Sequence, residues 1–302
     1  MAKMKNINKN WLDVSKVVPV TKTDHILRKN EGLKYGDDSY QQMDIYLPPT
    51  GKGPFPVIVN VHGGGMMSGD KHDWHLYPTL YALERGFAVA AVNYRLSPTV
   101  KYPTQVFDVK KALLWLKQNG TDYGVDKNNI FLWGTSAGGN LVLMNSLKKG
   151  IEKDGDSIAA QDIPIRAVAA LCPEIEINNL GGYGKLWERL YLALISIGHY
   201  QKVFGKKHVS EDEFRKTNPS SYIQDGIAPL YIQHGDNDFA VPVSQTIHFG
   251  KLVKPVLNED DLVVDILPGV SHAGNGSDFL MPERILPILK FFEKYIVIQG
   301  EA

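Results

Sequence analysis

The sequence lacks several features that would place it in specialised classes of protein. It has one cysteine, Cys172, so it can form no intrachain disulfide and no metal site built on several cysteines. Basic and acidic residues number 33 each, so the formal net charge is zero. This balance argues against a dedicated nucleic-acid-binding protein or a polyanionic substrate, although it leaves room for local basic patches. No apolar stretch approaches the roughly 20 residues needed to span a bilayer.

The first 29 residues also lack the continuous apolar core of a secretory signal. This segment is basic, and polar residues interrupt it throughout. We therefore expect a cytoplasmic protein, while a mature secreted form that has lost its signal would have the same appearance. Cys172 follows the apolar run 167–171, which favours a buried small side chain over a nucleophile at this position.

Strand-like and helix-like segments alternate along most of the 302 residues. Such alternation is typical of an α/β fold with a mostly parallel central sheet and helices on both faces. A chain of this length can bury about three-quarters of its unfolded surface in one core, so we expect a single domain over 1–302. We expect strands over 24–28, 42–47, 56–61, 87–92, 130–133, 165–171, 229–233 and 262–267, the first two antiparallel. We expect helices over 75–84, 104–118, 140–149 and 282–295.

The segment 173–227 interrupts this alternation. It is too long for an ordinary connection between two elements, and it contains the apolar run 186–197. We expect a helical insertion after the sixth strand, lying over the strand ends. A surface excursion without a role in substrate choice is the alternative.

Gly134-Thr135-Ser136-Ala137-Gly138 follows the apolar run 130–133 and precedes a helix-like segment. This arrangement is typical of a nucleophile elbow, in which a serine is held in strained backbone geometry between a strand and a helix. The positions two before and two after the serine must carry almost no side chain, and Gly134 and Gly138 meet that requirement. An ordinary glycine-rich turn has the same pattern, but the flanking strand and helix favour the catalytic interpretation.

His62-Gly63-Gly64-Gly65 follows directly after the strand-like run 56–61. Three successive glycines after a buried strand expose backbone N–H groups, which can stabilise the negative charge that develops on oxygen during acyl transfer. A flexible turn is the alternative, and the elbow downstream favours the first interpretation. We expect the ring of His62 to brace this loop by hydrogen bonding rather than to act as a base.

A catalytic serine needs a base, which we expect late in the chain on a loop that follows a strand. His272 meets this expectation, because it follows the strand-like run 262–267 in a glycine-containing loop. Asp236 and Asp238 follow the strand-like run 229–233, and both are candidates for the acid that orients the base.

Three other histidines lie near these motifs. His72 and His75 could suggest a metal pair, but no carboxylate arrangement beside them requires one, so we expect solvated or capping roles. His234 lies at the end of a strand, beside the loop that carries Asp236 and Asp238, and we expect a structural role for it.

Taken together, these segments resemble the α/β-hydrolases of the hormone-sensitive-lipase-like and acetyl-esterase-like group, within the wider esterase/lipase superfamily. The resemblance spans nearly the whole catalytic domain. It rests on His62-Gly63-Gly64-Gly65, Asn93-Tyr94-Arg95-Leu96-Ser97-Pro98, Gly134-Thr135-Ser136-Ala137-Gly138-Gly139, His234-Gly235-Asp236-Asn237-Asp238 with Val241-Pro242, and Gly269-Val270-Ser271-His272. It implies an α/β-hydrolase fold and a catalytic triad of Ser136, His272 and Asp238.

The same resemblance implies an oxyanion hole formed by the backbone amides of Gly64, Gly65 and Ala137. In similar hydrolases, an insertion such as 173–227 acts as a lid or as a wall of the acyl pocket.

Two further expectations come from the resemblance. Arg95 and Asp108 match residues that form a structural ion pair in related enzymes. The chain departs from many lipase-like relatives at Thr135, where they have aspartate, and at Met66, where they have an aromatic residue. Neither departure touches the triad, but both leave the subfamily and the acyl-chain preference open.

The expected activity is therefore hydrolysis of small or short-acyl carboxylic esters, acetyl esters among them, through an acyl-enzyme on Ser136. Amide or peptide hydrolysis by the same triad is the alternative. A non-catalytic small-molecule receptor is a less favoured alternative, because such a receptor would be expected to lose part of the triad. We expect no metal, no organic cofactor, no nucleic-acid partner and no membrane span. The oligomeric state stays open, and a homodimer is one option.

Overall fold

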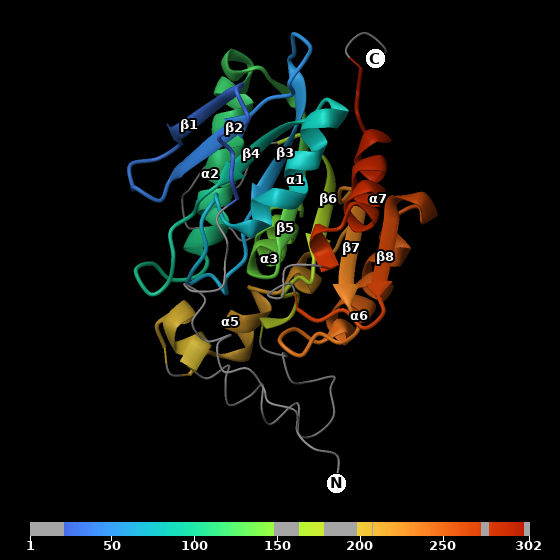
Figure 1. Cartoon of the computed structure of the whole chain (residues 1–302). Helices are drawn as coiled ribbons and strands as arrows, with labels where there is room; N and C mark the ends of the chain where they lie inside the picture. Colours follow the sequence, from blue (N-terminus) through green and yellow to red (C-terminus); the bar gives the residue numbers. More distant parts are fainter. Residues whose placement is uncertain (1–20, 148–162, 178–197, 207, 273–277, 299–302) are drawn as a thin grey trace, which may run out of the picture.

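The computed structural model describes residues 21–147, 163–177, 198–206, 208–272 and 278–298. Its centre is an eight-stranded sheet with the order β1-β2-β4-β3-β5-β6-β7-β8 (Figure 1). β2 pairs antiparallel with both β1 and β4, and all other neighbours are parallel. The strands are β1 Lys29–Lys34, β2 Gln42–Tyr46, β3 Phe55–Val61, β4 Ala88–Val92, β5 Val125–Thr135, β6 Ile165–Leu171, β7 Leu230–Gly235 and β8 Leu262–Leu267. The predicted α/β fold is confirmed.

Helices cover both faces of the sheet, which explains why the inner strands read as nearly continuous apolar runs. One face packs against α2 (Thr104–Asn119), α3 (Ala137–Ser146) and α6 (Val243–Val253). The other face packs against α7 (Pro282–Glu293) and the short helices near α1 (Tyr77–Leu80), as Figure 1 shows. No helix among the described residues is long and apolar enough to cross a membrane.

The first strand was predicted at 24–28, and this prediction is wrong. These residues lie in a turn region, and β1 begins at Lys29, which pairs with Tyr46. β1 is an edge strand with no fully buried residue, so its sequence lacks the apolar alternation that marks a half-buried strand.

The helix predicted over 75–84 is broken into a 3-10 turn (Trp74–Leu76), α1 and a second 3-10 turn (Tyr81–Arg85). Asp73 caps the first turn by accepting a hydrogen bond from the amide of His75. Gly86 ends the last turn in the left-handed conformation, at φ 82°. The apolar spacing located the segment but could not distinguish the tighter turns from a regular helix.

The insertion after β6 contains a helix over 198–204, α5 (Glu211–Arg215) and a 3-10 turn (Pro219–Tyr222). The apolar run 186–197 lies outside the described residues. Figure 1 places α5 beyond the carboxyl ends of the strands. The insertion is tied to the nucleophile helix there, because Asn140 Nδ2 donates to the carbonyl of Thr217 at 3.2 Å.

Candidate active site

Ser136 lies in the tight turn between β5 and α3, with φ 56° and ψ −120°. This turn requires its two flanking glycines. A Cβ at position 134 would lie 2.3 Å from the carbonyl oxygen of Gly138, and one at position 138 would lie 2.2 Å from that of Val61. The close approach of the α3 helix to β3 is thus possible only without side chains at these positions.

Three side chains from distant loops meet at the carboxyl ends of the strands. Ser136 Oγ lies 3.0 Å from His272 Nε2, and His272 Nδ1 lies 2.6 Å from Asp238 Oδ2. Because a carboxylate only accepts, Nδ1–H of His272 donates to Asp238, which leaves Nε2 to accept from the serine hydroxyl. The structure thus brings together the serine, histidine and second aspartate named from the sequence.

The side chain of Asp238 is fully buried and held by three further contacts. Its Oδ1 accepts from the amides of Ala240 and Val241 at 2.9 and 2.8 Å, and its Oδ2 lies 3.1 Å from His234 Nε2. Burial alone would raise the pKa of Asp238, but the charge of His272 and hydrogen bonds from His234 and His272 outweigh burial and hold this pKa well below its ordinary value. His234 therefore has the structural role expected of it, directly on Asp238.

His272 shows the opposite balance of the same forces. Burial would lower the pKa of the imidazole, but the negative charge of Asp238 outweighs it, and Cys172 adds to the effect, so the pKa is raised well above 6.5. Cys172 is buried, as predicted, and its Sγ lies within 4.8 Å of ligand atoms of His272 and Asp238. Its position beside these two side chains was not predicted from the sequence.

Asp236, the other candidate acid, binds the backbone of the loop that carries the imidazole. Its Oδ1 accepts from the amide of Gly269 at 2.6 Å. This hydrogen bond joins the acid loop, which follows β7 and carries Asp236 and Asp238, to the histidine loop, which follows β8 and carries His272.

The glycine loop after β3 places free amides beside the serine. Gly64 and Gly65 have φ 102° and 60°, and within the described part of the chain neither amide enters a backbone hydrogen bond. Ala137 is the first residue of α3, and amides in the first helical turn have no partner within the helix. A Cβ on Gly63 would lie 3.3 Å from Ser136 Cβ, so the loop packs directly against the elbow.

His62 braces this loop in the manner expected. Its Nδ1–H donates to the carbonyl of Gly63 at 2.8 Å, and its ring stacks on Tyr94 with centroids 4.3 Å apart. Tyr94 donates its hydroxyl to the carbonyl of His62 at 3.0 Å. Complete burial lowers the pKa of His62, which keeps the ring neutral and suits it to a structural role.

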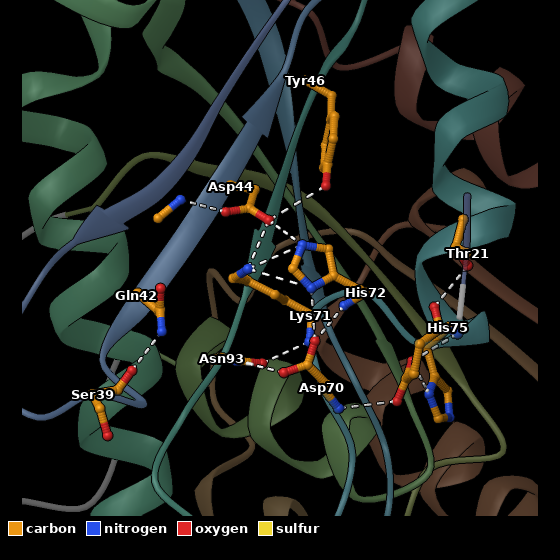
Figure 2. A network of polar contacts seen from close by, with 12 residues as sticks. Thr21, Ser39, Gln42, Asp44, Tyr46, Asp70, Lys71, His72, His75 and Asn93 are labelled. Carbon is orange, nitrogen blue, oxygen red and sulfur yellow. Dashed lines mark hydrogen bonds and ion pairs between the residues drawn. The ribbon is translucent and has the colours of Figure 1, made fainter. Parts of the chain in front are cut away.

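A polar network fixes the far end of the same loop (Figure 2). Asn93 accepts from the amide of Lys71 at 2.6 Å and donates to Asp70 at 2.9 Å. The ammonium of Lys71 lies 2.8 Å from Asp44 Oδ2, so the loop is tied to β2. Because the ammonium of Lys71 already compensates the negative charge of the buried Asp44, the network of Asp44, Asp70, Lys71 and Asn93 needs no metal ion for charge balance. Of this network, Asn93, which belongs to a motif noted above, and His72 were singled out from the sequence.

His72 belongs to this network, and His75 lies next to it. Each ring nitrogen of His72 faces a carboxylate, Nδ1 at 2.9 Å from Asp70 and Nε2 at 2.6 Å from Asp44. His75 donates from Nδ1 to Asp73 at 2.6 Å, beside the cap of the first turn. The two histidines thus bind different carboxylates and do not form a pair.

Arg95 and Asp108 form the predicted ion pair. The guanidinium is bidentate, with Nη2–Oδ1 at 2.7 Å and Nε–Oδ2 at 2.9 Å. Gln41 also donates to Asp108, at 2.7 Å.

The insertion reaches the glycine loop through His199, which belongs to the helix over 198–204. A Cβ at Gly65 would lie 3.1 Å from His199 Cε1. Met66, which follows the glycine triplet, is fully buried in the hydrophobic core. The fold and this site define an α/β-hydrolase.

Comparison with known proteins identifies the family. The family model BD-FAE matches residues 43–252, and the chain belongs to this family. The chain is similar to the probable carboxylic ester hydrolase LipM of Mycobacterium tuberculosis, with 26% identity over 79% of this chain and 56% of the relative. It is also similar to the isoprenylcysteine alpha-carbonyl methylesterase ICME of Arabidopsis thaliana, with 27% identity over 77% of this chain and 54% of the relative. The chain thus spans about half the length of these relatives, and the predicted resemblance to the carboxylesterase group is confirmed.

Solved structures share the fold. A truncated carbohydrate esterase from gut microbiota superposes with a TM-score of 0.75 at 19% identity, covering 92% of this chain and 99% of that one. Esterase B from Lactobacillus rhamnosis superposes with a TM-score of 0.72 at 20% identity, covering 91% and 88%. At these identities the likeness concerns the fold alone.

Proposed function

We propose that this chain is a serine carboxylic ester hydrolase that works through an acyl-enzyme. The observation that carries the proposal is the continuous hydrogen-bonded series from Ser136 Oγ through His272 to Asp238, at 3.0 and 2.6 Å. A serine hydroxyl is a weak nucleophile at neutral pH, and a general base in contact with it, as here, is one way to activate it.

In the first step, Ser136 Oγ attacks the ester carbonyl carbon while His272 Nε2 accepts the serine proton. The tetrahedral intermediate then collapses, the bond to the alcohol oxygen breaks, and the imidazolium gives its proton to the leaving alcohol. Water attacks the acyl-serine in the second step, with His272 again as the base; the bond between the acyl carbon and Ser136 Oγ then breaks, the imidazolium returns its proton to the serine, and the carboxylic acid leaves. Asp238 holds the imidazole in the required tautomer and stabilises the imidazolium.

The amides of Gly64, Gly65 and Ala137 hold the oxyanion in both steps. Their supporting evidence is the packing of the glycine loop against Ser136 and the location of Ala137 at the start of α3. Removing one such donor typically costs about 10²- to 10³-fold in rate. The positive end of the α3 dipole adds to the stabilisation.

The substrates we propose are small esters with short acyl groups, acetyl esters among them. A relative 34% identical over 48% of this chain is named a versiconal hemiacetal acetate esterase, and the relatives above are named esterases. In this proposal His199, which lies over Gly65, forms one wall of the pocket.

The experiment is steady-state hydrolysis of p-nitrophenyl esters of increasing chain length, with acetylated sugars and aryl formamides alongside. We expect the wild-type chain to cleave short-chain esters, and Ser136→Ala and His272→Ala to lower kcat by several orders of magnitude with unchanged thermal unfolding. Near-wild-type activity in both variants would refute the proposal. Preference for the formamides would assign the triad to amide hydrolysis instead.

A further inference from the structure

Two of the three glycines after β3 pack against backbone within the site. A Cβ on Gly63 would lie 2.9 Å from the carbonyl oxygen of Thr135, the last residue of β5. A Cβ on Gly64 would lie 2.3 Å from the carbonyl oxygen of Ser68, which belongs to the same loop. Backbone atoms cannot move aside as the end of a flexible side chain can. Gly63 and Gly64 are therefore held by the strand and loop that surround them.

Gly65 has a different neighbour, which comes from the insertion. Among the described residues, the atoms nearest to a Cβ there belong to the imidazole of His199, with Cε1 at 3.1 Å and Nδ1 at 3.6 Å. Met67 Cε follows at 3.9 Å. The imidazole thus packs against the Cα of Gly65, and a residue far along the chain supplies the closest contact on this side of the glycine loop.

The residues on either side of Gly65 are fixed by hydrogen bonds, whereas glycine itself imposes little preference on φ. The amide of Met67 donates to the carbonyl of Gly64 at 3.1 Å, and the carbonyl of Met66 accepts from the amide of Ser97 at 2.8 Å. Gly65 lies between them at φ 60°. Glycine adopts left-handed and right-handed conformations with similar ease, so an external contact decides which of them it keeps.

The helix that carries His199 is anchored to the body of the molecule. Val203 of this helix is fully buried, and its carbonyl accepts from the amide of Tyr102 at 3.0 Å. Tyr200 donates its hydroxyl to the carbonyl of Ile177, in the stretch that follows β6. His199 is therefore presented to the glycine loop by a fixed helix.

We propose that His199 is a positioning residue, whose imidazole holds Gly65 in the conformation that directs its amide toward the oxyanion. The inference rests on the proposed ester hydrolysis and assigns part of its transition-state stabilisation to the insertion. The ring acts through Gly65 and touches no reacting atom. Without the ring, the glycine can leave the left-handed conformation, and the oxyanion loses the alignment of one donor. Because oxyanion donors act mainly in the transition state, kcat falls while KM changes little.

Steady-state hydrolysis of p-nitrophenyl acetate by His199 variants is the first test. We expect His199→Ala to lower kcat by about tenfold, with KM within about twofold of the wild-type value. His199→Phe keeps a flat ring against Gly65 and should recover most of the lost kcat. Gln201→Ala, at an exposed position of the same helix, is the matched control and should change neither constant. A change in KM alone would make His199 a wall of the pocket and overturn the inference.

A trifluoromethyl ketone separates binding of the oxyanion from binding of the substrate. Ser136 Oγ adds to its carbonyl carbon, the serine proton passes to His272, and the carbonyl oxygen becomes an oxyanion that imitates the tetrahedral intermediate. In His199→Ala, we expect the inhibition constant to rise by about the same factor as kcat falls. In Gln201→Ala it should stay at the wild-type value. An unchanged inhibition constant in His199→Ala would overturn the inference, because the oxyanion donors would then be unaffected.

A double-mutant cycle tests the contact itself. Gly65→Ala strains the backbone and adds a Cβ 3.1 Å from His199 Cε1, whereas in the His199→Ala background only the strain remains. The two effects should therefore not multiply. We expect kcat of the double variant to exceed the value calculated for independent effects by about fivefold or more. Effects that multiply would overturn the inference.

Thermal unfolding and the ester assay distinguish the ways in which the inference can fail. His199→Ala and His199→Phe should unfold close to the wild-type temperature, since the ring is partly exposed. Wild-type kcat in His199→Ala, or equal losses of kcat in both variants, would overturn the inference and leave the proposed ester hydrolysis standing. Failure of the wild-type chain to hydrolyse any ester would instead refute the proposed function, and this inference with it.

Discussion

The carboxylate of Asp236 accepts a hydrogen bond from the amide of Gly269 at 2.6 Å, which joins the acid loop to the histidine loop. The loop that carries His272 is therefore held by a residue that does not touch the imidazole. We expect Asp236→Ala to lower kcat by about tenfold, because a small displacement of the base misaligns proton transfer. Asp236→Asn keeps an accepting oxygen and should retain most of the activity. Equal kcat in the alanine variant and wild type would contradict this positioning role.

Gly138→Ala should damage both folding and activity. The new Cβ would lie 2.2 Å from the carbonyl oxygen of Val61 and 2.5 Å from that of His62, and these backbone atoms cannot move aside as a flexible side chain could. We expect a loss of about 1–3 kcal/mol in the free energy of unfolding, from denaturant titration, together with a large fall in kcat. Gly198→Ala is the matched control, because nothing lies within 4 Å of a Cβ there. Similar stability of the two variants would show that the elbow is less tightly packed than described.

The pH dependence of kcat/KM should report the raised pKa of His272. The imidazole must be neutral to accept the serine proton, so kcat/KM falls as the pH drops through this pKa. We expect the midpoint of that fall above 6.5, the ordinary value for histidine. Asp238→Asn removes the charge that raises the pKa, so the midpoint should move to lower pH, while the plateau falls by about 10⁴-fold. His25→Gln, at an exposed histidine, is the control. An identical midpoint in wild type and Asp238→Asn would contradict this assignment.

Asn93→Ala tests the network that holds the glycine loop. It removes the contacts with the amide of Lys71 and with Asp70, so the loop should lose its fixed position relative to Ser136 (Figure 2). We expect kcat to fall by about 10- to 100-fold with a smaller change in KM, because the oxyanion amides act mainly in the transition state. Asn258→Ala, at an exposed turn before β8, should change neither constant. A change in KM alone would assign the network to substrate binding rather than to the oxyanion.

Most of the sheet could be predicted from the sequence because its parallel strands are buried on both faces and appear as short apolar runs. β1 could not, since an edge strand in contact with one neighbour needs no such pattern. Local motifs at strand ends predicted Ser136 and His272, whereas the choice of Asp238 over Asp236 came from the family resemblance. The cluster of Asp44, Lys71 and Asp70 had no local signature, because its contacts with Asp44 and Asn93 join residues that lie far apart in the chain.

The identity of the nucleophile is tested most directly by covalent labelling. The chain is treated with a fluorophosphonate probe, digested and analysed by mass spectrometry. The account predicts a single adduct on the peptide that carries Ser136, no adduct in Ser136→Ala, and much slower labelling in His272→Ala. An adduct on another residue, or equal labelling of the wild-type chain and Ser136→Ala, would contradict it.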